Sequence, residues 1–310
     1  MNEKLKMYIP SGNLEKFVLE IMDGSGFEPE KPDRGYVINT NSNVWDFKQI
    51  KTRDQPYMVA GGMGDLCVVG EDILKEFQLG YPHLSDNLEI LEYFEGRPTK
   101  LVAVVLVDKY QAVNSLSEFF ESVGDDARIA AEYPNIAKEY VLKNFGLDVD
   151  VYKPSGKTEA TLIGGRSEMD LIIDTMETGN TIKANGGKII DTLMDSKQVV
   201  VVNKLAYGVS DKKSEIDNLL EQFNGVMRAR QKILRKLQVN VFEEEDVSKV
   251  VDYLVDEGFR PTVSKLYPYG ADVYVVLPDG DIKSVCPKLN VLGGSDMVVT
   301  KIERVIYPTE

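Results

Sequence analysis

Three observations predict an α/β protein with a two-lobed core and a smaller domain at its C-terminal end. Strand-length apolar runs alternate with amphipathic helix patterns from residue 5 onward, as in a sheet with helices packed on it. The apolar strands Leu101–Val107 and Gln198–Val202 predict two crossings between similar α/β lobes, and such proteins bind ligands in a cleft at the carboxyl ends of their strands. Beyond a long helix, the order strand, helix, strand, strand, helix, strand predicts a ferredoxin-like βαββαβ domain.

The first lobe is predicted from short apolar runs separated by helix patterns. Leu66–Val69 is a continuous apolar run with the length of a buried strand, and Leu14–Met22 carries apolar residues at helical spacing. In chain order, the predicted elements are strand Lys6–Ile9, helix Leu14–Met22, strands Tyr36–Asn39 and Phe47–Ile50, helix Pro56–Gly61, strand Leu66–Val69 and helix Glu71–Glu76.

The second lobe repeats this alternation and begins with strand Leu101–Val107. Its further predicted elements are helix Ser115–Ser122, strand Arg128–Ala131, helix Pro134–Asn144, strand Val149–Tyr152, helix Thr158–Ile163 and strand Leu171–Ile173. The chain then returns to the first lobe through strand Gln198–Val202. We expect residues 1–104 and 196–236 to form the first lobe with a connecting helix, and residues 105–195 to form the second lobe.

A long amphipathic helix is predicted to connect the lobes to the last domain. Residues Ser214–Lys236 carry an apolar stripe at helical spacing that includes Ile216, Leu220 and Phe223. Over residues 237–310, the predicted elements are strand Val239–Phe242, helix Val247–Glu257, strands Thr262–Leu266 and Asp272–Leu277, helix Ile282–Leu292 and strand Met297–Tyr307.

Composition and charge narrow the class of protein. The chain has 310 residues, of which 43% are hydrophobic and 28% charged, and its net charge is −14. Its apolar runs are shorter than the roughly 18 residues of a transmembrane helix, so no membrane association is expected. The start of the chain lacks the apolar core of a signal peptide, and we expect a cytoplasmic protein. The acidic balance argues against nucleic-acid binding but is compatible with a small anionic ligand.

The histidine and cysteine content excludes several kinds of catalytic site. His83 is the single histidine, so Ser-His-Asp triads, Cys-His pairs and multi-histidine metal sites are not expected. It follows Tyr81-Pro82 and is interpreted as a surface residue. Cys67 and Cys286 lie in different predicted domains and are interpreted as buried thiols. The chemistry must therefore use carboxylates, hydroxyls, lysines or a bound metal.

The segment Asp170–Thr181 gives the strongest indication of function. The apolar strand Leu171–Ile173 leads to Asp174 and Glu177 and then to the turn Thr178-Gly179-Asn180-Thr181. Backbone N–H groups, a glycine and two hydroxyls at a helix start suit a phosphate. Neighbouring carboxylates suit the hydroxyls of a ribose or a Mg²⁺ ion on a pyrophosphate. The pattern favours a phosphoribosyl site, although the same order of strand, turn and helix also occurs in α/β proteins without that function.

Eight segments in a fixed order carry a family resemblance. They are Pro10–Leu14, Gly62–Leu74, Arg128–Asn135, Ser155–Glu159, Asp170–Gly186, Gly225–Arg230, Arg260–Val263 and Leu292–Asp296. Together they resemble the ATP phosphoribosyltransferases that open histidine biosynthesis, in their long form with a C-terminal regulatory domain. The resemblance covers nearly the whole chain and implies a catalytic core of the type II periplasmic-binding-protein-like fold.

The resemblance also implies a reaction. The family transfers the phosphoribosyl group of phosphoribosyl pyrophosphate to N1 of the adenine of ATP and releases pyrophosphate. Adenine N1 is already a neutral nucleophile, so no strong general base is required and a chain with one histidine is adequate. What remains is to align two anionic substrates and to neutralise the leaving pyrophosphate with Mg²⁺ and cationic side chains.

Roles for particular residues follow from the resemblance. Asp174, Glu159 and Lys51 are the predicted catalytic residues, with Asp174 beside the ribose hydroxyls. The predicted substrate-binding residues are Glu177, Thr178, Gly179, Asn180 and Thr181 at the 5′-phosphate, together with Ser11, Gly12, Tyr133 and Asp170. No side chain is assigned as a metal ligand. The family further implies free histidine as an allosteric inhibitor bound within residues 238–310 and assembly as a homohexamer.

Departures from the family pattern concentrate on the ATP and pyrophosphate side. Asn13 stands where a basic residue is usual and Lys51 where an arginine is usual. Cys67 and Val69 replace a glycine and a threonine, and Ala131 replaces a threonine. These changes leave open a diverged paralogue with a regulatory role or a different nucleophile. A solute-binding protein with the same hinged topology is a further alternative.

Four basic residues are candidates to compensate for Asn13. They are Lys16, Lys51, Arg53 and Lys157. The alternative for each of them is an ordinary solvated position on the surface, where most lysines and arginines lie.

Overall fold

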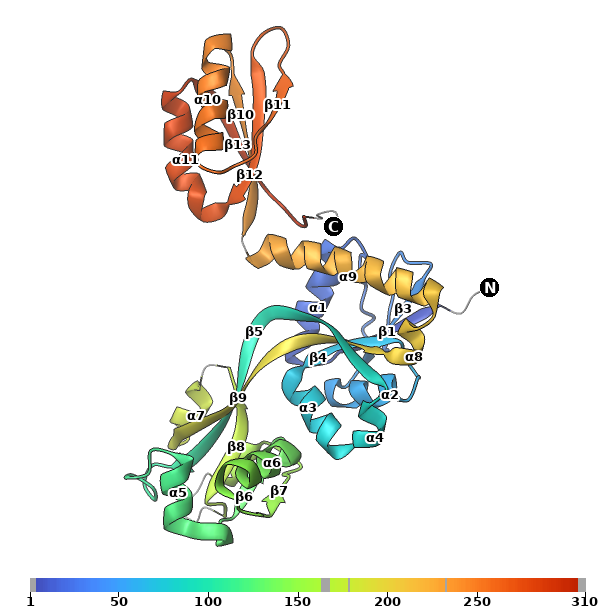
Figure 1. The fold of residues 1–310 in the computed structure, drawn as a ribbon, viewed down its shortest axis with the longest axis vertical. Helices are drawn as coiled ribbons and strands as arrows, with labels where there is room; N and C mark the ends of the chain where they lie inside the picture. Colours follow the sequence, from blue (N-terminus) through green and yellow to red (C-terminus); the bar gives the residue numbers. More distant parts are fainter. Residues whose placement is uncertain (1–3, 163–167, 178, 232, 306–310) are drawn as a thin grey trace. The chain divides into compact units, whose positions relative to one another are not determined.

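The computed structural model describes residues 4–162, 168–177, 179–231 and 233–305, which form two compact units (Figure 1). One unit comprises residues 1–20 and 28–216, and the other comprises residues 21–27 and 217–310. The first unit is built on a nine-stranded mixed sheet and the second on a four-stranded antiparallel sheet. The predicted class, a two-lobed α/β core with a ferredoxin-like domain, is confirmed.

The nine-stranded sheet contains both predicted lobes. Its strands lie in the order β2 (Val37–Ile38), β3 (Trp45–Ile50), β1 (Leu5–Pro10), β4 (Leu66–Gly70), β9 (Gly187–Asn203), β5 (Leu88–Leu106), β8 (Leu171–Met176), β6 (Ile129–Ala131) and β7 (Val151–Tyr152). We call the side of β1 to β4 the first half and the side of β6 to β8 the second half. In the first half, β1 lies between β3 and β4, and in the second half, β6 lies between β7 and β8. The shared strand β9 is next to β4, and the shared strand β5 is next to β8.

The shared strands β5 and β9 join the halves. Residues 88–94 of β5 pair with residues 198–203 of β9 in the first half, and residues 99–106 pair with residues 187–196 in the second half. The register shifts between Phe94 and Thr99, where one half gives way to the other. These strands are the two predicted crossings, but they are much longer than predicted.

Helices surround the sheet in both halves. Around the first half lie α1 (Asn13–Gly24), η1 (Thr52–Asp54), α2 (Gln55–Ala60), α3 (Glu71–Gly80), α4 (Pro82–Ser85) and α8 (Lys204–Tyr207). Around the second half lie α5 (Leu116–Val123), η2 (Gly124–Asp126), α6 (Pro134–Phe145), η3 (Thr158–Thr161) and α7 (Asn180–Ala184). The predicted helix Thr158–Ile163 is thus a short 3₁₀ turn, and Ile163 lies outside the described residues.

Central strands bury both of their faces, which explains why their sequences are continuous apolar runs. Every residue of β4 is buried, and Val199–Val202 of β9 are fully buried beside it. The first half has a core around Tyr8, Val69 and Val201. In the second half, Phe119 and other side chains of α5 and α6 pack on β5, β6 and β8 in a separate core.

The second unit has the predicted ferredoxin-like order. Its elements are β10 (Leu234–Val241), α10 (Glu244–Asp256), β11 (Thr262–Lys265), β12 (Ala271–Pro278), α11 (Asp279–Val291) and β13 (Gly294–Lys301), and the strand order is β11-β12-β10-β13. Figure 1 shows α10 and α11 on one face of this sheet, where Leu237, Val273 and Leu289 are fully buried. The helix α9 (Ser210–Gln231) leads from the first unit into the second along the chain.

Two predicted boundaries in this part of the chain are wrong. The helix predicted over Ser214–Lys236 ends at Gln231, because Ile233 takes a positive φ of 43° and the next residues form β10. Leu237 therefore faces the core of a sheet instead of extending the apolar stripe of the helix, and Leu234 is buried in the same strand. The last strand ends at Lys301, and the predicted end at Tyr307 lies outside the described residues.

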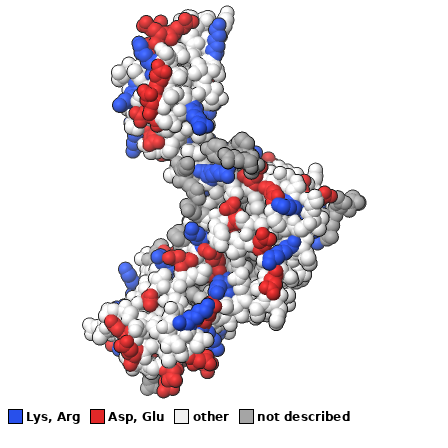
Figure 2. All heavy atoms as spheres, viewed as in Figure 1, with Lys and Arg blue, Asp and Glu red and all other residues white. Residues whose placement is uncertain are grey.

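The surface is mixed in charge. Figure 2 shows Asp and Glu interspersed with Lys and Arg on the visible face of each unit, with no continuous basic stripe among the described atoms. His83 is exposed in α4, as predicted. Cys67 is buried, whereas Cys286 is only half-buried. Among the helices that the structure describes, none has the length and apolar character needed to cross a membrane.

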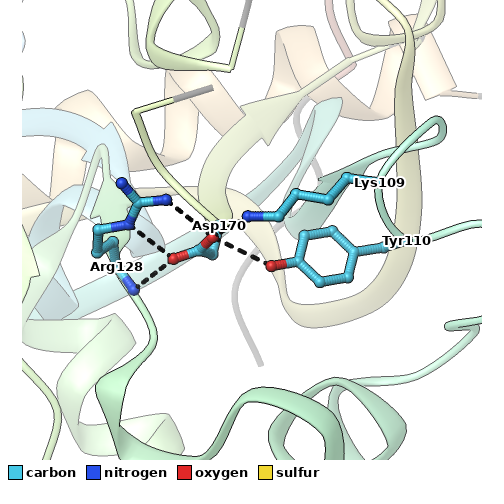
Figure 3. Close-up of polar contacts among 4 residues, drawn as sticks. All are labelled: Lys109, Tyr110, Arg128 and Asp170. Atoms are coloured by element: carbon cyan, nitrogen blue, oxygen red, sulfur yellow. Dashed lines mark hydrogen bonds and ion pairs between the residues drawn. The ribbon is translucent and has the colours of Figure 1, made fainter. Parts of the chain in front are cut away.

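Asp170, immediately before β8, ties the ends of three neighbouring strands together. Its carboxylate accepts hydrogen bonds from the backbone N and Nε of Arg128 at 3.1 and 2.9 Å and from the Tyr110 hydroxyl at 3.1 Å, and it pairs with Lys109 (Figure 3). Arg128 precedes β6, and Lys109 and Tyr110 follow β5. The hydrogen bonds from Arg128 hold the pKa of Asp170 well below its usual range.

We expect Asp170→Asn to lower the free energy of unfolding by about 2 kcal/mol at pH 7, because two cations lose their partner. Since the pKa of Asp170 is lowered in the folded state, its contribution is fully present above the unfolded pKa of about 4 and begins to be lost below that value, until the pH has fallen through the much lower pKa of the folded state. Urea unfolding at several pH values should therefore show the variant and the wild type converging toward pH 3.

Asp150→Asn is the matched control, because Asp150 is fully exposed and lies 3.8 Å from its partner Lys138. It should change stability little at any pH. Equal stability of Asp170→Asn and the wild type at pH 7 would contradict an anchoring role for Asp170.

Candidate active site

A cavity of about 1250 Å³ opens between the two halves of the nine-stranded sheet. It lies at the carboxyl ends of the parallel strands, as expected for this topology. The first half contributes residues that follow β1, β3 and β4: Ser11, Gly12, Lys51, Thr52, Arg53, Asp54, Gly70 and Asp72. The second half contributes residues at the ends of β6 and β8 and around α7: Glu132, Tyr133, Thr175, Met176, Glu177, Gly179, Thr181 and Ile182.

Most of the predicted site residues meet at this cavity. Ser11, Gly12 and Lys51 line it from the first half, and Tyr133, Glu177, Gly179 and Thr181 line it from the second. Asn180 is the exposed first residue of α7 and does not line the cavity. Thr178 lies outside the described residues. Asp170 does not join this group: it lies at the opposite end of β8, in the ion-pair cluster described above.

The turn before α7 has the backbone form that its glycine predicts. Gly179 adopts a positive φ of 73°, a conformation that residues with a side chain rarely take. A Cβ atom at this position would lie 2.9 Å from the sulfur of Met176. Backbone and neighbouring side chain therefore both require glycine here, and the turn brings the backbone close to the cavity.

Asp174 and Glu159, two of the predicted catalytic residues, lie together at the end of β8, but they are not among the described residues that line the cavity. Burial, with the neighbouring carboxylate of Glu159 as a further cause, raises the pKa of Asp174 to about 6. The backbone N–H of Thr175 donates a 2.7 Å hydrogen bond to the Asp174 carboxylate and opposes this shift. A carboxylate that titrates near pH 6 is an anion at neutral pH and can then accept hydrogen bonds from ribose hydroxyls.

Arg53 is the cation that faces these acids. It forms an ion pair with Glu132, and its guanidinium carbon lies 5.4 Å from the ring centre of Tyr133. It also acts on Asp174, whose pKa it lowers against the larger effect of burial. Because Arg53 belongs to η1 and Glu132 follows β6, their ion pair spans the cavity from one half of the sheet to the other.

The partners of Arg53 are themselves held in place. The hydroxyl of Thr158, which is buried, donates a 3.4 Å hydrogen bond to the Glu132 carboxylate, and the Glu132 backbone N–H donates to the Ile173 carbonyl at 2.9 Å. Burial, together with the neighbouring Asp72 carboxylate, raises the pKa of the Tyr133 hydroxyl, which stays protonated. Glu132 and Tyr133 thus have fixed positions at the wall of the cavity.

A further contact between the halves positions this wall. The carboxylate of Glu76 on α3 accepts hydrogen bonds from the backbone N–H groups of Asn135 and Ile136 at 3.2 and 3.0 Å and from the Asn135 amide at 3.0 Å. These groups belong to the first turn of α6, whose free N–H groups favour a negative charge. Burial nevertheless raises the pKa of Glu76. The segment that carries Glu132 and Tyr133 is therefore fixed to the first half.

The candidates to compensate for Asn13 divide into two groups. Lys16, Lys51 and Arg53 line the cavity, whereas Lys157 does not. Lys16 lies 3.8 Å from Glu20 on the same helix and is strongly exposed. Lys51 is exposed at the mouth of the cavity. The side chain of Asn13 lies outside the described part of the structure.

The acids at the cavity do not form a preformed metal cage. Among the described residues, no group of three or more His, Cys, Asp or Glu side chains is arranged to hold a metal ion. Mg²⁺ in phosphate-transfer sites is commonly held by one or two carboxylates together with substrate phosphates. The paired carboxylates of Asp174 and Glu159 fit that kind of donor set.

Sequence reasoning missed three residues of this site. Glu132 and Asp72 belong to segments that carry the family resemblance, but neither has a predicted role in the site. Arg53 was considered only as a substitute for Asn13. The signal that could have identified Arg53 and Glu132 is positional, because each follows the carboxyl end of a predicted strand, where ligands of α/β proteins bind.

Comparisons with known proteins agree with the geometry. The family model described as HisG, ATP phosphoribosyltransferase, matches residues 51–225. A curated ATP phosphoribosyltransferase of Archaeoglobus fulgidus is 36% identical over 249 residues, which cover 80% of this chain and 87% of the relative. A second, from Sulfurisphaera tokodaii, is 31% identical over 305 residues and covers 97% of this chain and 100% of the relative.

A solved structure has the same fold. It is described as the ATP phosphoribosyl transferase (HisG:HisZ) complex of Thermotoga maritima, and it aligns with a TM-score of 0.57 at 23% sequence identity. The alignment covers 72% of this chain and 98% of that chain. At this level of identity the match supports the two-lobed fold.

We expect Asp174→Asn to raise the free energy of unfolding by about 1–2 kcal/mol at pH 7.5, because it removes a buried charge beside Glu159. Since the pKa of Asp174 is raised in the folded state, the wild type loses stability as the pH rises from about 4 to about 6, and asparagine has no such loss. Urea unfolding between pH 4 and pH 7.5 measures the difference.

Asp150→Asn again serves as the control for a charge removed from the surface. The advantage of Asp174→Asn should largely disappear near pH 4, where this aspartate is protonated in the folded protein and about half protonated in the unfolded chain. A difference that did not vary with pH would show that the Asp174 proton is not its cause.

Proposed function

The chain belongs to the ATP phosphoribosyltransferase family of histidine biosynthesis, and on that premise we propose how its cavity arranges the reaction. The phosphoribosyl group lies on the side of β8 and α7, and ATP lies on the side of β1, η1 and α3. The observation that carries this assignment is that the glycine turn before α7 and the basic residues of the first half line one cavity. Its 1250 Å³ exceeds the roughly 300–1,000 Å³ of a typical single-ligand site, as two substrates require.

On the phosphoribosyl side, the turn around Gly179 holds the 5′-phosphate. The positive φ of Gly179 and the space limited by Met176 support close approach of the backbone to the ligand. The Thr181 hydroxyl supplies a donor at the same wall. Asp174 accepts hydrogen bonds from the ribose hydroxyls, with Glu159 beside it.

On the ATP side, cationic side chains balance the leaving group. Adenine N1 forms a bond to the anomeric carbon with its lone pair, and the bond between that carbon and the pyrophosphate oxygen breaks with its electron pair leaving on the oxygen. The developing negative charge is stabilised by Lys51 and Arg53. Lys16, one turn from the start of α1, contributes a further positive charge near position 13, where the family usually has a basic residue.

A divalent ion completes the charge balance, and we propose that it is Mg²⁺. When bound, Mg²⁺ neutralises the pyrophosphate oxygens of phosphoribosyl pyrophosphate. The residues of this chain that would hold it are Asp174 and Glu159, because their oxygens form the donor set that Mg²⁺ prefers.

The proposal extends to regulation and assembly. We propose that free histidine binds within residues 238–310 as an allosteric inhibitor, that the chain assembles as a homohexamer and that it works in the cytoplasm without nucleic-acid or membrane partners. The ferredoxin-like order of the second unit supports a ligand-sensing role. Coupling to the cavity requires two global states with different affinity for histidine.

We expect the protein to release pyrophosphate when it is mixed with ATP, phosphoribosyl pyrophosphate and Mg²⁺, and we expect Gly179→Val to reduce this release at least about 100-fold. Valine cannot adopt the positive φ without strain, and its side chain meets the sulfur of Met176. The assay is coupled phosphate detection after hydrolysis of the pyrophosphate, and calorimetry measures the affinity for phosphoribosyl pyrophosphate.

Gly146→Val is the matched control, because Gly146 has a φ of 69° and ends α6, away from the cavity. It introduces the same backbone strain and should leave the affinity for phosphoribosyl pyrophosphate unchanged. EDTA should abolish release, and added Mg²⁺ should restore it. If Gly179→Val bound phosphoribosyl pyrophosphate with unchanged affinity, the assignment of the 5′-phosphate to this turn would be wrong.

The diverged-paralogue alternative predicts a different result in the same assay. The absence of a usual basic residue at Asn13 is the observation that favours it. Such a protein would bind phosphoribosyl pyrophosphate but release no pyrophosphate with ATP.

Truncation after Gln231 should leave the first unit folded and abolish inhibition by histidine. The cut follows the end of α9 and removes the whole ferredoxin-like sheet, whose core is separate from the cores of the first unit. Histidine is titrated against full-length and truncated protein while pyrophosphate release is followed. If the truncated protein were inhibited at the same histidine concentration, the histidine site could not lie within residues 238–310.

A further inference from the structure

We propose that Glu132 is a specificity-determining residue that competes with the pyrophosphate group of the substrate for Arg53. The inference rests on the proposed function, in which Arg53 faces the pyrophosphate. It goes further by assigning a role to a carboxylate that lines the same wall of the cavity.

The first step is the position of the pair. Arg53 comes from the first half of the sheet and Glu132 from the second, and both line the cavity. Their ion pair therefore lies in the space that a substrate must enter. It is only partly exposed, with 42% of the Arg53 side chain and 22% of the Glu132 side chain accessible to solvent.

The second step is that Glu132 is held ready for this contact. Its second carboxylate oxygen accepts the hydrogen bond from Thr158, whose side chain is buried, and its backbone is bonded to β8. On the other side, the Tyr133 ring supports the guanidinium of Arg53. A pair preorganised from both sides costs little conformational entropy and persists in the free protein.

The third step is the chemistry of exchange. A guanidinium binds a carboxylate and a phosphate through the same fork of N–H donors, so the two anions exclude each other from one face of Arg53. Glu132 offers a single negative charge, whereas pyrophosphate offers several charges on two linked groups that Lys51 can also reach. Pyrophosphate can therefore displace Glu132, and an anion with fewer charges does so less well.

This competition gives selectivity at a cost in affinity. If Arg53 is free of Glu132 in only about a tenth of the molecules, the apparent affinity falls about tenfold for an anion that binds through Arg53 alone, and falls less for an anion that also contacts a second cation. The loss matters most for weak competitors such as inorganic phosphate, which lack the second phosphoryl group. Glu132 thus increases the preference of the Arg53 subsite for ligands that carry a pyrophosphate.

The test is calorimetric titration of the full-length protein with pyrophosphate and, separately, with inorganic phosphate, in the presence of Mg²⁺. We expect Glu132→Gln to bind inorganic phosphate about tenfold more tightly than the wild type, and to bind pyrophosphate more tightly by a smaller factor, so that the preference for pyrophosphate falls. Glu121→Gln, on the exposed face of α5, removes the same charge outside the cavity and should bind both anions as the wild type does.

A second variant, Glu132→Asp, tests the proposal if Glu132→Gln does not fold. Glu132→Asp keeps the charge but shortens the side chain, and it should tighten pyrophosphate binding by a smaller factor than Glu132→Gln. Equal or weaker pyrophosphate binding in both variants, with the wild type still binding pyrophosphate, overturns the competition and leaves the proposed function intact. If neither the wild type nor the variants bind pyrophosphate, Arg53 does not face this ligand and both assignments fail.

Discussion

The antiparallel pairing of β5 with β9 is the constraint on which the active site depends. One end of the pair completes the first half of the sheet and the other end completes the second, with a register shift between Phe94 and Thr99. Because each half contributes parallel strands beside this pair, the carboxyl ends of both sets open onto one cavity. Loops after β1, β3 and β4 can then share a ligand with loops after β6 and β8, although they are far apart in the sequence.

Charge is the second constraint, because an acidic chain must hold anionic substrates. The cavity contains more acids than cations among its described lining, and Arg53 is paired within it. A net charge of −14 therefore does not exclude pyrophosphate, since a few local cations decide the potential inside a cleft. Under the proposed function, a ligand that binds Arg53 must displace the Glu132 carboxylate.

The sequence predicts the parts of this protein whose signal is local. The continuous run Leu66–Val69 is a buried central strand, and the glycine at position 179 marks a turn with positive φ. Local sequence does not predict the elements whose structure depends on pairing with a neighbouring strand. Residues 187–197 of β9 are largely polar and half-buried, and they form a strand because β5 lies beside them. The predicted helix beyond Gln231 fails similarly: Leu234 and Leu237 have helical spacing, but Leu237, Val239 and Val241 alternate on one face of β10 in the core of the sheet.

The acidic residues also differ in how far local sequence places them, as Asp170 and Glu132 show. Both are acids in segments that resemble the family, and they differ in their position relative to the neighbouring strand. Asp170 precedes its strand, so its partners Arg128 and Tyr110 gather at the end of the sheet away from the cavity. Glu132 follows its strand and meets Arg53 across the cavity. A carboxylate that precedes a parallel strand therefore lies at the end of the sheet away from the cavity, and one that follows the strand lies beside the cavity. The direction of each strand in the assembled sheet decides between the two.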